Sequence, residues 1–107
     1  MEKMSFREFM LFLMEDPGCT LIYQTAAQDW FSEFKNQAMI SLYGTKFTWT
    51  LNPNVMVIRN GFSEVRFDDV LHVLLDRRGG FTIIELVCAD PYDQTTRSYR
   101  LRLVPNT

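Results

Sequence analysis

Residues that commonly carry metal or nucleophilic chemistry are scarce in this chain. It has 107 residues, of which two are cysteines and one is a histidine. Cys19 and Cys88 lie far apart in the sequence, outside any Cys-x-x-Cys or Cys/His spacing. A catalytic divalent metal usually has three protein ligands, which one histidine without motif-spaced partners does not supply. We therefore expect no metal, no cofactor and no catalytic residue. We expect two buried thiols, with one disulfide in an exported protein as the alternative.

Long apolar runs are also missing. The segment FMLFLM at 9–14 is far shorter than the ~20 apolar residues that a membrane-spanning helix needs. It follows Arg7-Glu8, and no small-residue cleavage site comes after it, so it does not have the pattern of a signal peptide. We expect a soluble, cytoplasmic protein that does not enter a membrane.

An excess of one charge is the third absence. The net charge is −2, and acidic and basic residues alternate along the chain without forming blocks. Electrostatics alone therefore gives no reason to expect binding to nucleic acid or to an anionic membrane. Hydrophobic residues make up 47% of the sequence and include nine phenylalanines, which is enough for a core. The length predicts a single domain over residues 1–107.

The N-terminal part of the sequence carries two helix signals. The first predicted helix, 5–15, opens with the capping-box pair Ser5 and Glu8. The second, 26–36, follows Thr25, which forms a similar box with the glutamine three residues later. Its apolar residues recur at helical spacing: Ala27, Trp30, Phe31 and Phe34. Both segments are therefore predicted to be helices.

A third helix is predicted over residues 68–78. Asp68-Asp69 stands at its start and Arg77-Arg78 at its end, an arrangement that complements the helix dipole. Gly79 follows, and glycine suits the left-handed position after a helix.

Alternating residues and turn dipeptides predict the strands. The pair Asn60-Gly61, between two alternating runs, is typical of a type I′ hairpin, and Gly44-Thr45 joins two similar runs upstream. The predicted strands are 19–24, 38–43, 46–51, 55–59, 62–67, 81–88 and 97–104. The expected fold class is α+β, with two N-terminal helices, an antiparallel β-meander, one further helix and a C-terminal strand pair.

The N-terminal helix is the first candidate binding surface. Apolar residues occupy nearly every side of it from Phe9 onward, whereas a surface helix usually has a polar back. We expect part of this surface to contact a protein partner or a second copy of the chain, through Phe6, Met10, Phe12 and Met14.

Two other sites are alternatives. Arg97, Arg100 and Arg102 on the last strand could contact a nucleic acid backbone, although no aromatic side chains alternate with them on that face. His72 has acidic residues three and four positions away, the spacing of an acid–base pair or a metal site. Enzyme signatures are otherwise absent, so the leading hypothesis is a non-catalytic interaction module such as an adaptor, an inhibitor or a subunit.

Overall fold

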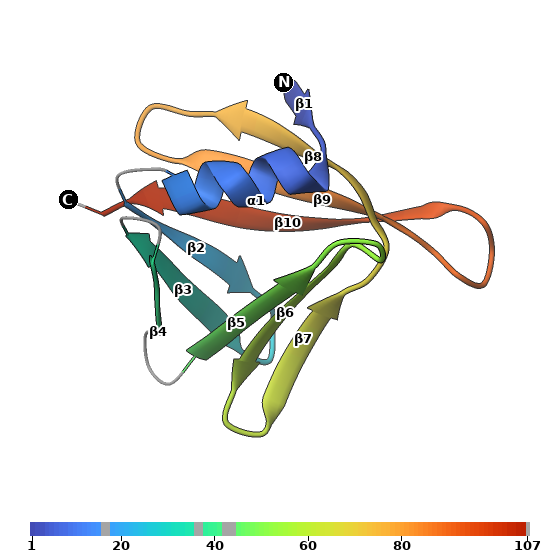
Figure 1. Ribbon diagram of the computed structural model, residues 1–107, viewed down its shortest axis with the longest axis horizontal. Coiled ribbons are helices and arrows are strands. Elements are labelled where there is room, and N and C mark those ends of the chain that lie inside the picture. Colours follow the sequence, from blue (N-terminus) through green and yellow to red (C-terminus); the bar gives the residue numbers. More distant parts are fainter. Residues whose placement is uncertain (16–17, 36–37, 42–44, 107) are drawn as a thin grey trace.

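Strands dominate the computed structural model, which describes residues 1–15, 18–35, 38–41 and 45–106 (Figure 1). These residues contain one helix, α1 (Phe6–Glu15). It begins as the sequence predicts, because the amide of Glu8 donates a hydrogen bond of 3.0 Å to the hydroxyl of Ser5.

The larger of two antiparallel sheets has seven strands. In spatial order they are β1 (Glu2–Met4), β8 (Val70–Arg77), β9 (Thr82–Ala89), β10 (Thr96–Pro105), β2 (Cys19–Gln24), β3 (Asp29–Lys35) and β4 (Ala38–Ser41). The smaller sheet has three strands: β5 (Thr45–Thr50), β6 (Val55–Asn60) and β7 (Ser63–Phe67). Most predicted strands are present within two residues of their expected ends, but the α+β fold class with three helices is wrong.

The second predicted helix, 26–36, is the turn of the β2–β3 hairpin followed by strand β3, and residue 36 lies outside the described residues. The hydroxyl of Thr25 accepts hydrogen bonds from the amides of Ala27 and Gln28, so the chemistry of a helix cap closes a turn instead. The spacing of the apolar residues in 26–36 is compatible with a helix and with a strand. Trp30 and Phe34 are four residues apart, as on one side of a helix. Ser32 between them is also buried, however, and burial of every second residue is typical of a strand.

The third predicted helix is strand β8. A β-bulge between Val70 and His72 shifts the alternation by one residue, so that Val70 and Val73 both face the core. Because of this bulge, two buried residues lie three positions apart, a spacing that also occurs on one side of a helix. Asp69 has φ of 50° and lies at a corner, where its carbonyl accepts from the amide of Ala89. Gly79-Gly80 forms the loop of the β8–β9 hairpin.

Two turn predictions change in detail. Asn60 pairs with Ser63, so the β6–β7 loop is Gly61-Phe62, one residue later than predicted. Gly61 has φ of 62° at the first loop position, which glycine occupies in a type II′ turn. Residues 38–41 pair with β3 in the large sheet and not with β5. Gly44 and the predicted end of that strand, 42–43, lie outside the described residues.

The core lies between the inner faces of the two sheets and under α1 (Figure 1). Phe67, at the end of β7, makes edge-to-face contacts with Tyr23 and Tyr99 of the large sheet, with ring centroids 5.0 and 5.1 Å away. Phe34 and Phe47 make a second contact of this kind, at 5.2 Å. Aromatic side chains therefore join the two sheets.

Candidate interaction surface

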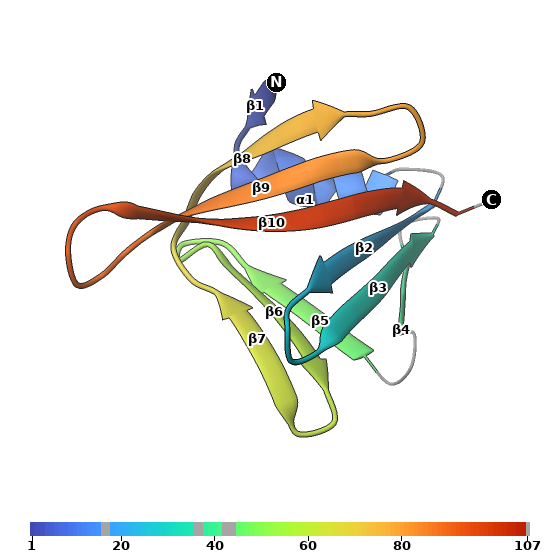
Figure 2. The ribbon, with the colours of Figure 1, turned by 180° about the vertical axis from the view of Figure 1, so that it is seen from behind.

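The large sheet has one covered face and one open face. Figure 2 views it from the side opposite α1, where β8, β9, β10, β2 and β3 lie in front of the helix. Leu101 and Leu103 of β10 point into the core, so the alternate residues Arg100 and Arg102 point the other way. We call this open side the outer face. Its residues are His72, Leu74, Asp76, Ile83, Glu85, Val87, Ser98, Arg100, Arg102, Ile22, Gln24 and Phe31.

Apolar side chains are numerous on the outer face. Ile22, Phe31, Leu74 and Ile83 are each half-buried, which leaves part of their surface in contact with water. An antiparallel sheet that is solvated on one side usually shows polar residues there. The mixture of aliphatic, aromatic and arginine side chains resembles instead the composition of protein–protein interfaces.

Two arginines lie near the middle of this face. The guanidinium of Arg102 donates to the side-chain oxygen of Gln24 at 2.9 Å. Arg100 lies directly across from Glu85 in the strand register, and neither side chain forms a hydrogen bond or an ion pair with a described residue. Arg100 borders a shallow depression of about 240 Å³, which Ile22 also lines. The outer face therefore carries one exposed arginine that is available to an anionic group.

Arg97 does not join the other two arginines. Its guanidinium pairs with the carboxylate of Asp90, which is only 5% exposed. The hydrogen bond that Arg97 donates to this carboxylate, together with the carboxylate's negative charge, raises the pKa of Arg97. The other oxygen of Asp90 accepts from the amide of Tyr92, at the projecting tip between β9 and β10 (Figures 1 and 2). Arg97 thus holds this loop, and the predicted three-arginine site is reduced to Arg100 and Arg102.

The second alternative site is centred on His72. His72 lies half-buried on β8, beside Val87 of β9. Within residues 1–15, 18–35, 38–41 and 45–106, no three His, Cys, Asp or Glu side chains are grouped as a metal site requires.

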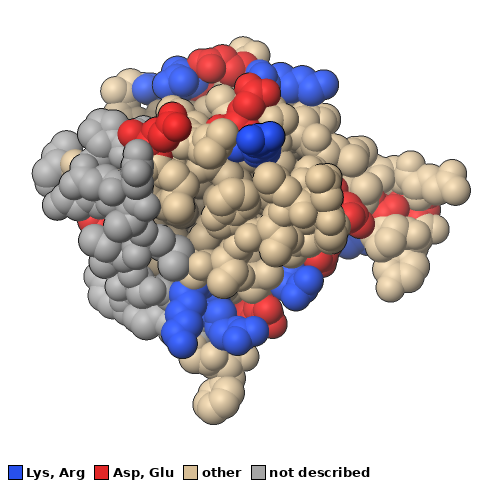
Figure 3. All heavy atoms as spheres, in the orientation of Figure 1, with Lys and Arg blue, Asp and Glu red and all other residues tan. Residues whose placement is uncertain are grey.

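The four residues predicted on the N-terminal helix belong mainly to the core. Phe6 and Met10 are fully buried, and Phe12 and Met14 are half-buried against other core residues. Leu11, at 43% exposure, is the large apolar residue of α1 that remains on the surface. In Figure 3, which shows the α1 side of the molecule, charged side chains lie at the rim and in the upper middle, and uncharged side chains fill the region below them.

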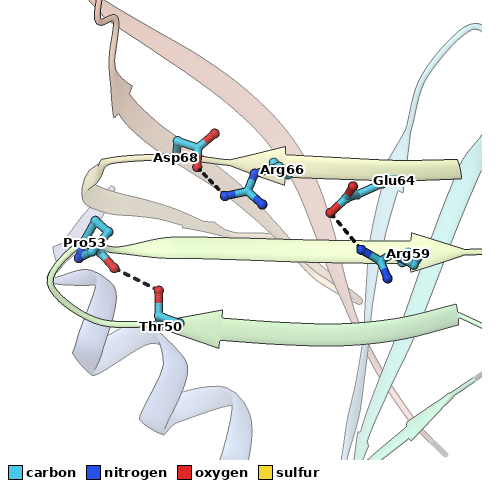
Figure 4. Close-up of polar contacts among 6 residues, drawn as sticks. All are labelled: Thr50, Pro53, Arg59, Glu64, Arg66 and Asp68. Carbon is cyan, nitrogen blue, oxygen red and sulfur yellow. Dashed lines mark hydrogen bonds and ion pairs between the residues drawn. The ribbon is translucent and has the colours of Figure 1, made fainter.

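Along the outer side of the small sheet, four charged side chains pair with one another, and Lys46 is exposed beside them. Arg59 forms an ion pair with Glu64 at 3.4 Å, and Arg66 forms one with Asp68 at 3.2 Å (Figure 4). Below them, Thr50 donates to the carbonyl of Pro53 in the turn between β5 and β6 (Figure 4). These pairs leave less unmatched charge for a partner than the outer face of the large sheet does.

A cleft of about 270 Å³ lies beside the end of α1. Phe12, Arg77, Phe81 and Leu103 are among its lining residues. Arg77 lies over the ring of Phe12, with 5.9 Å between the guanidinium carbon and the ring centroid, and pairs with Glu2. Arg78, which also lines the cleft, pairs with Asp76, so the charges of both arginines are matched within the chain.

Both cysteines are buried and are not joined in a disulfide, as the sequence predicts. Burial raises the pKa of Cys88 to about 11, and the nearby Asp68 and Asp69 act in the same direction. A catalytic thiol needs a lowered pKa, so Cys88 is unsuited to nucleophilic attack.

The raised pKa of Cys88 predicts a loss of stability in alkali. The unfolded chain loses the thiol proton near its ordinary pKa of 9.0, whereas the folded chain keeps it until about pH 11. The free energy of unfolding should therefore be constant with respect to this group below pH 9, and should fall by about 1–2 kcal/mol between pH 9 and pH 11. Urea titrations across this range should show a smaller fall in Cys88→Ala. Equal falls in both proteins would contradict this account of the thiol.

Comparison of the chain with protein-family models, with curated proteins and with solved structures gives no significant match. No helix among the described residues is long and apolar enough to cross a membrane. Any statement about function therefore depends on the surfaces described above.

Proposed function

We propose that this chain is a non-catalytic protein-interaction module that binds its partner through the outer face of the large sheet. The observation that carries the proposal is the exposed Arg100 among half-buried apolar side chains on a sheet side that no described helix covers. This replaces the N-terminal helix as the proposed contact surface, because Phe6 and Met10 are engaged in the core.

The chemistry of the outer face indicates what the partner presents. Arginine forms bidentate, charge-assisted hydrogen bonds with carboxylates, and Arg100 has no such partner among the described residues. The apolar side chains beside it, Ile22 and Leu74, favour aliphatic or aromatic groups. We therefore expect a protein segment with an acidic residue next to apolar ones.

Nucleic acid remains the alternative partner, as the sequence predicts. The outer face argues against it, because Glu85 lies on the same face as Arg100 and Arg102 and would repel phosphates. A cytoplasmic location remains part of the proposal, and two buried thiols that are not joined in a disulfide agree with a reducing compartment.

A random peptide library displayed on phage tests the proposed surface and does not require an identified partner. The library is selected on the wild-type protein, and each selected peptide is then measured against Arg100→Glu/Arg102→Glu. We expect the peptides to contain an acidic residue beside apolar residues, and to bind the double variant at least tenfold more weakly, because two attractive charges become repulsive.

Lys46→Glu is the matched control, because Lys46 is an exposed base on β5, away from the outer face. It should leave peptide affinity unchanged. Peptides that bind the wild type and the double variant equally well would overturn the proposed surface. Oligonucleotides that bind better than any peptide, with an affinity that falls steeply with salt, would move the nucleic-acid alternative to first place.

A further inference from the structure

We infer that the occupant of the outer face is a second copy of this chain, in a two-fold dimer that pairs Arg100 of each copy with Glu85 of the other. This inference depends on the proposed function, since it names the partner for the same surface. It rests on two observations: the charges of the outer face are complementary to themselves, and the face has the area of a small specific interface.

Charge self-complementarity follows from the strand register. Glu85 of β9 and Arg100 of β10 are register partners in the centre of the outer face. A two-fold axis parallel to these strands, midway between them and just outside the sheet, places β9 of one copy over β10 of the other. Each Arg100 then lies opposite the partner's Glu85, so that two ion pairs form from residues that have no partner among the described residues of a single copy.

The neighbouring positions accept the same symmetry. Arg102 pairs with Ile83 in the register, and Ser98 pairs with Val87. The same axis therefore places Arg102 over the partner's Ile83 and Ser98 over the partner's Val87. No like charges are opposed at these central positions, and the aliphatic stem of an arginine packs well on an isoleucine.

The area of the outer face is close to what a specific dimer requires. Five of its strands contribute, and β8 and β9 each have eight residues. With strands about 4.8 Å apart and a rise of about 3.3 Å per residue, the face covers roughly 600 Å² on each copy. The total is therefore about 1,200 Å², the lower limit for specific complexes, and we expect a reversible dimer whose population depends on concentration.

Sedimentation velocity at protein concentrations of ~5–500 µM tests this inference, with variants in which the charges of Arg100 and Glu85 are reversed. The wild type should shift from monomer toward dimer as its concentration rises. Arg100→Glu and Glu85→Arg should each weaken association at least tenfold, because each change opposes two pairs of like charges. Combining the two changes should restore the dimer. Glu85 is half-buried, so Glu85→Gln is a milder second variant that removes the attraction with little change in shape.

Lys46→Glu again serves as the control for net charge and should associate like the wild type. A chain that stays monomeric at every concentration overturns the dimer, and so does a dimer that Arg100→Glu and Glu85→Arg leave unchanged. Neither result removes the proposed function, which fails only if the selected peptides bind elsewhere. Circular dichroism melts of each variant establish that the comparison is between folded proteins.

Discussion

Replacing Phe67 with alanine is expected to lower the free energy of unfolding by about 3–5 kcal/mol, the range for deleting a buried aromatic side chain. Phe67 is fully buried, and its ring touches Tyr23 and Tyr99 across the junction of the two sheets. The substitution removes both ring contacts and leaves a cavity that the surrounding strands fill only in part. Urea unfolding followed by tryptophan fluorescence measures the change.

Phe62→Ala is the matched control for this prediction. Phe62 lies on the same hairpin, in the loop before β7, and its side chain is fully exposed. Its removal should change stability by less than ~0.5 kcal/mol, as for other surface positions. Similar losses in the two variants would mean that Phe67 does not join the sheets as described.

Met10→Ser is expected to cost about 2–5 kcal/mol, because it deletes a fully buried side chain and places a hydroxyl in an apolar environment. Leu11→Ser, at the next residue of α1, should cost less than ~1 kcal/mol, because Leu11 is already 43% exposed. Thermal unfolding monitored by circular dichroism compares the two.

The sequence alone predicts that Met10 contacts another chain. If that prediction were right, replacing Met10 would alter association and leave the fold intact. A Met10→Ser protein that is as stable as the wild type but associates less would support the N-terminal helix as a contact surface. It would contradict the burial of α1 against the large sheet.

Capping and turn residues in the sequence predicted where helices and strands end better than they predicted whether a segment is a helix or a strand. The hydroxyl acceptor of Thr25 suits a helix cap and a hairpin turn equally well, so it did not discriminate between them. Trp30 and Phe34 fit a helical stripe, and only the burial of Ser32 between them reveals the strand. In 68–78, the acidic start, the arginine pair and the glycine that follows suit a helix, but they stand at the ends of strand β8. Pairing with distant strands decided both cases, and pairing is not encoded locally.

The candidate surface was accessible to sequence reasoning only in part. Alternation in 97–104 correctly placed Arg100 and Arg102 together on one side of a strand. It did not reveal that Glu85 and Ile22, from distant segments, complete that side, although FTIIELVC shows the alternation of Ile83, Glu85 and Val87. The same alternation puts Arg97 on the side opposite Arg100 and Arg102, but its pairing with Asp90 depends on the fold of the β9–β10 loop.

The most direct measurement is an amide chemical-shift titration of the labelled chain with a selected peptide. If the outer face is the binding surface, the largest shifts should fall on residues 83–87 of β9, 98–102 of β10 and 22–24 of β2, and Arg100→Glu should abolish them. Shifts that concentrate instead on α1, on the Gly61-Phe62 loop or around Tyr92 would contradict the account, because they would place binding on a different surface of the molecule.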